Sequence, residues 1–174
     1  LYREKLSALP DYITIVAAVS FKNDMSMEEV IEFDNSLRDG HITWVGVRNS
    51  SANVQQLPLC GFKLHQSGLV FDKQNNTYPD LDIKGGIKTT SNLENHFTSM
   101  LRFLDDQYTA GTCIELHGNS SSQSYFKEVL DYVENNGIYS YGCYVTGSPQ
   151  TFLELLDSET VEQIWSQDAW FNFN

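Results

Sequence analysis

The chain contains little cysteine and has no long uninterrupted apolar segment. Its three cysteines, Cys60, Cys113 and Cys143, lie far apart, so at most one internal disulfide can form. No pair of them has the spacing of a zinc finger. No stretch approaches the roughly 18 unbroken apolar residues that a membrane-spanning helix needs. These absences exclude a disulfide-stapled scaffold and a membrane span within these 174 residues.

Positive charge is scarce and is almost missing from the second half of the chain. There are 11 Lys and Arg against 23 Asp and Glu, which gives a net charge of −12. Ten of the bases lie within residues 1–102 beside twelve acids, whereas from Phe103 onward eleven acids accompany a single base, Lys127. Nucleic-acid binding depends on Lys and Arg that displace counterions from the phosphates. The charge therefore excludes direct binding to nucleic acid and to an anionic membrane surface.

Length and composition indicate one globular domain. A chain of 174 residues fits a single domain, and 41% hydrophobic residues supply a sizeable core. The sequence contains no internal repeat, linker or low-complexity run.

The first third of the chain predicts a strand, a helix and a second strand. Tyr12 to Phe21 is short and rich in β-branched and aromatic residues, which is typical of a buried strand. Ser26 and Glu29 have the spacing of a capping box, so a helix is expected to start there and to end at Gly40. His41 to Arg48 alternates as a strand. If the two strands are parallel, their connection is expected to be right-handed.

The rest of the chain predicts further short strands and amphipathic helices. The expected strands are Gly61 to His65, Leu69 to Phe71, Thr112 to His117, Ile138 to Thr146 and Ala169 to Phe173. The expected helices are one opened by the Ser91–Glu94 capping box with an apolar stripe as far as Leu104, Ser122 to Asn136, one from Ser148-Pro149 to Leu156, and a turn or two over Ser158 to Trp165. Together they predict an α/β fold, a mixed sheet of five to seven short strands covered by four or so helices.

Two groups of side chains could hold a metal ion. Cys113, Glu115 and His117 alternate, so on a strand they share one face, where they could bind zinc or form a thiol activated by imidazole. No second cluster supplies a fourth ligand, and we interpret the segment as a half-buried strand. The second group offers oxygen ligands for calcium, but not in EF-hand order: Asp72, Asp80 and Asp82 with Asn75 and Asn76.

Local catalytic motifs are missing. Gly85-Gly86-Ile87-Lys88 lacks the upstream glycine and the following Ser or Thr of a phosphate-binding loop, and there is no G-x-S-x-G motif. Trp44, Trp165 and Trp170 are interpreted as core residues, with a ligand groove as the alternative. The sequence therefore assigns no catalytic, cofactor-binding or metal-binding residue and predicts a protein that is not an enzyme. A metal- or thiol-dependent enzyme and a free-standing extracellular ligand-binding module stay open as alternatives.

Several segments of the chain match one known family, and the most specific is YGCYVTGSPQTFLELL, Tyr141 to Leu156. The others are Val16 to Phe21 with the following Met25 to Val30, Ile42 to Val47, Gly61-Phe62, and the helix Phe97 to Leu104. Together they resemble the C-terminal domain of Gram-positive sigma-factor regulators, which are membrane-anchored anti-sigma-factor-like proteins. Residues 72–90 and 106–121 do not match that family, and the matching motifs carry no catalytic residue.

What this resemblance implies is an extracytoplasmic domain that detects an envelope signal or a partner protein. A spanning helix upstream of Leu1 is expected to join it to a cytoplasmic segment that holds a sigma factor. On this reading residues 1–10 are a stalk or linker and residues 11–174 are the regulatory domain. Signal transmission needs two states that the signal distinguishes energetically. The long polar segment 72–90 is predicted as the two-state element and as a partner-contacting surface.

Overall fold

A computed structural model describes residues 2–51, 59–64, 76–81, 89–109 and 124–171. The chain divides into two compact units. A sheet unit comprises Leu1–Val47, Gly61–His65 and Tyr139–Asn174, and a helical unit comprises Arg48–Cys60 and Gln66–Ile138. The α/β class predicted from the sequence is confirmed.

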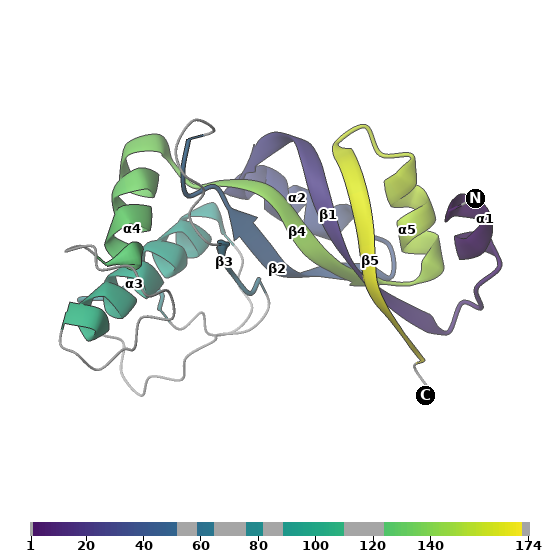
Figure 1. The fold of residues 1–174 in the computed structure, drawn as a ribbon, viewed down its shortest axis with the longest axis horizontal. Coiled ribbons are helices and arrows are strands. Elements are labelled where there is room, and N and C mark those ends of the chain that lie inside the picture. The colour runs from purple at the N-terminus through teal and green to yellow at the C-terminus, as the bar shows by residue number, and fades with distance from the viewer. Residues whose placement is uncertain (1, 52–58, 65–75, 82–88, 110–123, 172–174) are drawn as a thin grey trace. The chain divides into compact units, whose positions relative to one another are not determined.

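Five strands form one sheet in the order β3-β2-β4-β1-β5 (Figure 1). Their bounds are β1 Ile13–Ser26, β2 Gly40–Val47, β3 Cys60–Phe62, β4 Tyr139–Gly147 and β5 Val161–Phe171. β4 pairs antiparallel with both β1 and β2, and β5 pairs antiparallel with β1. β1 and β2 therefore run parallel to one another with β4 between them. The predicted strand–helix–strand unit is thus formed by two strands that are not direct neighbours in the sheet.

Two helices, α2 (Met27–Ser36) and α5 (Pro149–Leu156), contact the same strands, β1 and β4. Alternate residues of these strands are buried, as in Ile15, Ala17 and Val19. These residues face the buried side chains of the two helices because cross-strand partners share a face. The Asp34 carboxylate of α2 accepts a hydrogen bond from the Ile42 amide of β2 at 2.6 Å, which fixes that helix to the sheet.

Local signals start both helices where the sequence predicts. Ser26 and Glu29 form the capping box, with the Ser26 amide donating to Glu29 Oε2 at 2.7 Å and the Glu29 amide to Ser26 Oγ at 3.3 Å. Ser148 caps α5, and Pro149 occupies its first turn. A third helix of the unit, α1 (Tyr2–Ser7), packs against α5.

The helical unit is built on α3 (Thr90–Thr109) and α4 (Tyr125–Asn136), which pack against each other. The predicted apolar stripes are buried in both helices: Leu93, Phe97 and Leu101 in α3, and Val129, Leu130 and Val133 in α4. Gly137 ends α4 with a φ of 85° and a ψ of 169°, a backbone conformation that glycine adopts readily because it has no side chain.

Three details of the sequence prediction are wrong. Ser158 to Trp165 is predicted helical, but β5 begins at Val161, because β1 offers it backbone pairing from Ile13 to Phe21. α3 starts earlier than the Ser91 capping box, since the Thr89 hydroxyl accepts from the Asn92 amide at 3.2 Å. α2 ends at Ser36, and the left-handed residue that follows is Asp39, not Gly40.

The expected strands Leu69 to Phe71 and Thr112 to His117 lie outside the described residues. Residues 1–10, predicted as a stalk, include α1, and the domain boundary at residue 11 stays a prediction. In the parts of the chain that the structure describes, no helix has both the length and the apolar character to cross a membrane.

Candidate functional site

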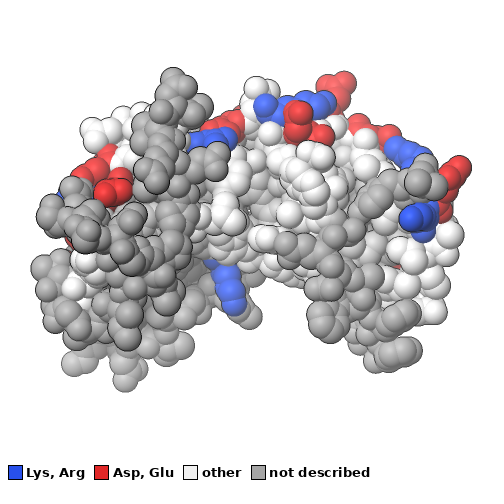
Figure 2. Space-filling model, viewed as in Figure 1, with Lys and Arg blue, Asp and Glu red and all other residues white. Residues whose placement is uncertain are grey.

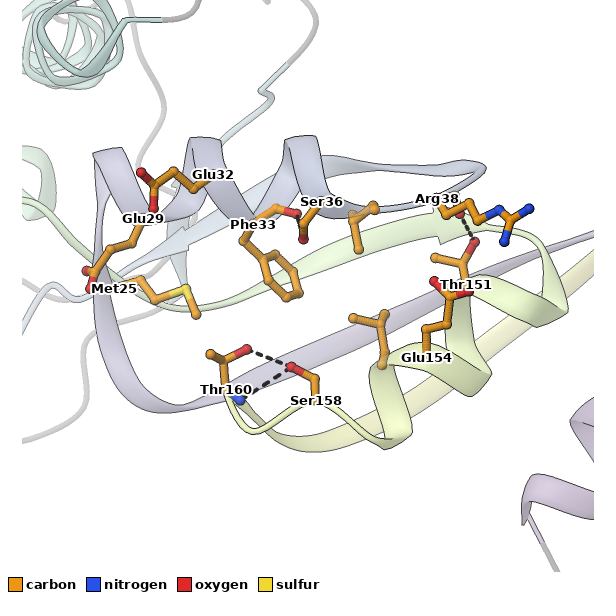
Figure 3. Close-up of a pocket in the computed structure, with 12 residues that line it drawn as sticks. Met25, Glu29, Glu32, Phe33, Ser36, Arg38, Thr151, Glu154, Ser158 and Thr160 are labelled. Atoms are coloured by element: carbon orange, nitrogen blue, oxygen red, sulfur yellow. Dashed lines mark hydrogen bonds between the residues drawn. The ribbon is translucent and has the colours of Figure 1, made fainter.

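A groove of about 500 Å³ lies in the sheet unit between α2 and α5 (Figure 3). Its third wall is the turn that contains Ser158 and Thr160, whose hydroxyls are 2.8 Å apart. The volume is within the range of ligand-binding pockets. The groove is therefore the candidate functional site.

Apolar side chains form the floor of the groove. Met25, Phe33 and Leu155 line it and are only 8%, 9% and 4% exposed. In Figure 3 Met25 and Phe33 project into the space between α2 and the 158–160 turn. The Phe21 ring packs edge to face against the Phe33 ring, and the two ring centroids are 5.2 Å apart. The side chains of the floor are thus held in place by the core, and binding of a ligand would not need to order them.

Carboxylates dominate the rim. Glu29 and Glu32 extend from α2, and Glu154 from α5, while Arg38 is the one base among the lining residues. The hydrogen bonds from the Ser26 amide and then from the Ser26 hydroxyl lower the pKa of the Glu29 carboxyl, so it stays ionised at neutral pH. The rim is therefore negatively charged.

The two helical walls are joined by side-chain and backbone contacts. The Thr151 hydroxyl of α5 donates to the main-chain carbonyl of Arg38, and the Ser148 amide donates to the Asp39 carbonyl at 3.3 Å. Thr151 fits here because Gly147 has no side chain: a Cβ on Gly147 would lie 2.8 Å from Thr151 Oγ1. These contacts set the spacing between the walls.

The back of α5 is in contact with α1. Arg3 of α1 forms a two-pronged ion pair with Asp157, which directly follows α5. Leu6 of α1 is only 5% exposed. α5 consequently borders the groove on one side and the N-terminal helix on the other.

A second hollow of about 480 Å³ lies beside the start of β1 and the end of β4. Asp39, His41 and Ser148 are among its lining residues, and Ser, His and Asp are the components of a nucleophilic triad. Ser148, however, caps α5: its hydroxyl accepts from the Thr151 amide at 3.3 Å. We assign this hollow no catalytic role.

The metal-binding candidates from the sequence are not assembled in the described part of the chain. Cys113, Glu115 and His117 lie outside it, as do Asp72, Asn75 and Asp82. Asp80 accepts a hydrogen bond from Asn95 Nδ2 at 3.0 Å. Among the described residues no three His, Cys, Asp or Glu side chains are grouped to hold a metal ion.

The described cysteines are buried. Burial, with a further contribution from the charge of Asp34, raises the pKa of the Cys143 thiol far above its ordinary value. Cys143 is therefore protonated and unreactive in the folded protein. Cys60 is buried as well.

The second face of the sheet carries a row of aromatic residues. Strand register places Trp44 beside Tyr144, with their rings 5.8 Å apart, and Trp165 beyond Ala18 on the next strands. Trp165 is 48% exposed, so its prediction as a core residue is wrong, and the side chain of Trp170 is not described. Figure 2 shows uncharged atoms among the described residues over the strands, with Lys, Arg, Asp and Glu along the upper edge and a base at the lower edge.

Residues 76–81, which belong to the polar segment 72–90, are attached to α3 by hydrogen bonds within the helical unit. Ser99 Oγ donates to the Pro79 carbonyl at 2.6 Å, and His96 Nδ1 lies 3.0 Å from the Asp80 carbonyl. Leu81, the residue after Asp80, is buried. The segment is thus anchored at its centre, which a polar composition alone did not indicate.

Sequence reasoning missed the groove because its walls come from distant parts of the chain. Arg38 and Thr151 are 113 residues apart. The only local signal was the pair of caps, Ser26 and Ser148, which predicted that two helices would start there but not that they would lie side by side.

Comparison with known proteins adds the family. The family model described as "Sigma factor regulator C-terminal" matches residues 6–164, a span that runs from α1 into β5 and includes both walls of the groove. The chain matches no curated protein and no solved structure at a significant level. The resemblance found in the sequence is thereby confirmed, and a regulatory role follows from it. The chain belongs to the family of sigma factor regulator C-terminal domains.

Proposed function

We propose that this chain is the non-enzymatic sensory domain of a membrane-anchored sigma-factor regulator and that it binds its signal or partner protein in the α2–α5 groove. On this proposal the domain lies on the extracytoplasmic face of a Gram-positive membrane. An upstream spanning helix anchors it, and a cytoplasmic segment before that helix holds the sigma factor. Family membership supports the regulatory part of the proposal.

The position of α5 is the observation that supports the groove as the binding site. This helix supplies Thr151, Glu154 and Leu155 to the groove, while Asp157 at its end pairs with Arg3 of α1. A ligand that shifts α5 would therefore act directly on the segment that leads toward the proposed anchor. Among the described elements that border the groove, α5 makes the most extensive contact with α1.

A regulator of this kind needs two states that the ligand distinguishes. A ligand shifts an equilibrium only by as much as its affinities for the two states differ, and each tenfold difference is worth about 1.4 kcal/mol. Docking of α1 on α5 is a suitable two-state element because α1 is a short helix, with Leu6 buried and with an ion pair from Arg3 to Asp157 that is exposed. The segment 72–90 remains a second proposed element, of which residues 76–81 are anchored.

Filling the groove tests the proposal. Ser36 lines the groove and is exposed, so Ser36→Trp would place a large side chain in it without disturbing the core. Asn35→Trp is the matched control, since Asn35 is also exposed on α2 and is not among the lining residues. In cells that carry the full-length protein and a reporter for its sigma factor, we expect Ser36→Trp to abolish the response to inducing conditions and Asn35→Trp to retain it. A normal response in Ser36→Trp would exclude the groove as the signal site.

The proposed location has its own test. Protease added to intact protoplasts should degrade this domain of the full-length protein and spare the cytoplasmic segment. Protection of the domain until the membrane is permeabilised would overturn the extracytoplasmic assignment.

A further inference from the structure

The groove combines an apolar floor with an acidic rim, and this combination selects a class of ligand. From it we infer that the occupant is a cationic amphipathic peptide, a segment with bulky apolar side chains on one face and Lys or Arg beside them. The inference rests on the proposed function of the groove and specifies its ligand.

The apolar floor favours a ligand that has apolar side chains. Met25, Phe33 and Leu155 are largely buried in the protein, and the apolar surface that they leave accessible lines the groove. A side chain inserted between them gains about 25 cal/mol for each Å² of apolar surface removed from water. A groove between two helices, with such a floor, suits the mode in which a peptide lays its apolar face into a preformed cleft.

The rim calls for positive charge. Glu32 has a position on α2 that faces the groove, and Glu154 faces it from α5, so cationic groups on either side of an apolar anchor would meet a carboxylate. Glu29 adds a third negative charge, held ionised by its contacts with Ser26. The guanidinium of Arg38 lies 3.9 Å from the Asp39 carboxylate, which offsets the one base of the rim.

The long-range field acts in the same direction. The sheet unit contains 13 acids and 5 bases, a formal charge of −8. A field of this sign accelerates the approach of cations and repels anions. Acidic peptides, nucleic acids and anionic lipid headgroups are therefore disfavoured, and a neutral apolar peptide would gain no attraction from the charge of the rim.

The test measures binding of designed peptides to the complete 174-residue chain by fluorescence anisotropy. The probe is a labelled amphipathic peptide of Leu and Lys. One comparison peptide has Glu in place of each Lys, and another has Ser in place of each Leu. We expect the Leu/Lys peptide to bind at least about tenfold more tightly than either, and its affinity to fall as salt screens the rim.

Variants of the chain locate the site. The double variant Glu32→Gln/Glu154→Gln should weaken binding of the Leu/Lys peptide roughly three- to tenfold, the effect of two exposed charge pairs. The matched control Glu28→Gln/Glu128→Gln removes the same charge from positions that do not line the groove and should leave affinity unchanged. Ser36→Lys, which places a cation of the chain itself at the groove, should weaken binding in the same way.

Three results would overturn the inference: no binding of the Leu/Lys peptide, equal binding of the Leu/Glu peptide, or equal losses in the groove and control variants. The last would mean that only the overall charge attracts the peptide. If Ser36→Trp abolishes regulation in cells while the Leu/Lys peptide fails to bind, the groove is the signal site and its ligand belongs to another class. If Ser36→Trp leaves regulation intact, the proposed function itself fails, whatever the peptides do.

Discussion

The hydroxyl of Thr151 in α5 donates a hydrogen bond to the main-chain carbonyl of Arg38, two residues beyond the end of α2. Thr151 is almost completely buried. One buried side chain therefore ties together the two helices that form the walls of the groove. The spacing between the walls depends on this contact and on the absence of side chains at Gly40 and Gly147, against which Thr151 packs.

Replacing the hydroxyl by a methyl group tests this contact. Thr151→Val keeps the shape of the side chain and removes the donor, and we expect the free energy of unfolding to fall by about 1 kcal/mol. Thr98→Val is the control, because Thr98 lies on α3 and bonds only to carbonyls of its own helix, Glu94 and Asn95. Chemical denaturation of both variants measures the difference; equal losses would show that the Thr151 bond has no special weight.

Adding a methyl group opposite Thr151 should be destabilising for a steric reason. In Gly147→Ala the new Cβ would lie 2.8–3.0 Å from three atoms of Thr151, closer than van der Waals contact allows. Overpacking of this kind costs about 1–3 kcal/mol. The double variant Gly147→Ala/Thr151→Ser removes the Thr151 methyl group and should recover part of the loss, seen as a coupling energy in a double-mutant cycle. Strict additivity of the two changes would contradict the packing described.

The buried thiol of Cys143 predicts a loss of stability at high pH. Its pKa is raised in the folded state by burial and by Asp34, whereas in the unfolded chain the thiol ionises above about pH 8.5. The stabilisation is complete below that pH and declines as the pH rises, because only the unfolded state then releases the proton. Between pH 7 and pH 10 this amounts to about 2 kcal/mol.

Urea unfolding at several pH values, in the native chain and in Cys143→Ala, isolates the contribution of this thiol. The native chain should lose stability faster with pH than the variant does. Parallel pH profiles would mean that Cys143 is not protected from ionisation in the folded protein.

Local sequence signals predicted those elements whose ends are fixed by neighbouring side chains. The capping box at Ser26 and Glu29 and the Ser148-Pro149 start of α5 are formed as expected, because each depends on residues within one helical turn. β5 was misread because its conformation depends on pairing with β1, which lies about 150 residues earlier in the chain.

The groove could not be predicted for a related reason. Its floor and rim come from β1, α2, α5 and the turn after α5, and only the sheet order β4-β1-β5 brings them together. The acidic excess of the second half is visible in the sequence, but the sequence does not indicate which carboxylates line a groove and which form ion pairs. Glu154 faces the groove, whereas Glu134 pairs with Arg102 within the helical unit at 2.7 Å.

We propose that a ligand bound in the groove shifts α5 and thereby α1. Leu6→Ala tests it most directly, because Leu6 is the buried residue of α1 and its truncation should weaken the docking of that helix. Leu59→Ala, the same change at an exposed site, is the control. The measurement is the reporter response of the full-length variants, alongside circular dichroism of the purified domains to confirm that both are folded. We predict a folded Leu6→Ala domain with no response to the signal and a normal response in Leu59→Ala; a normal response in folded Leu6→Ala would contradict the account.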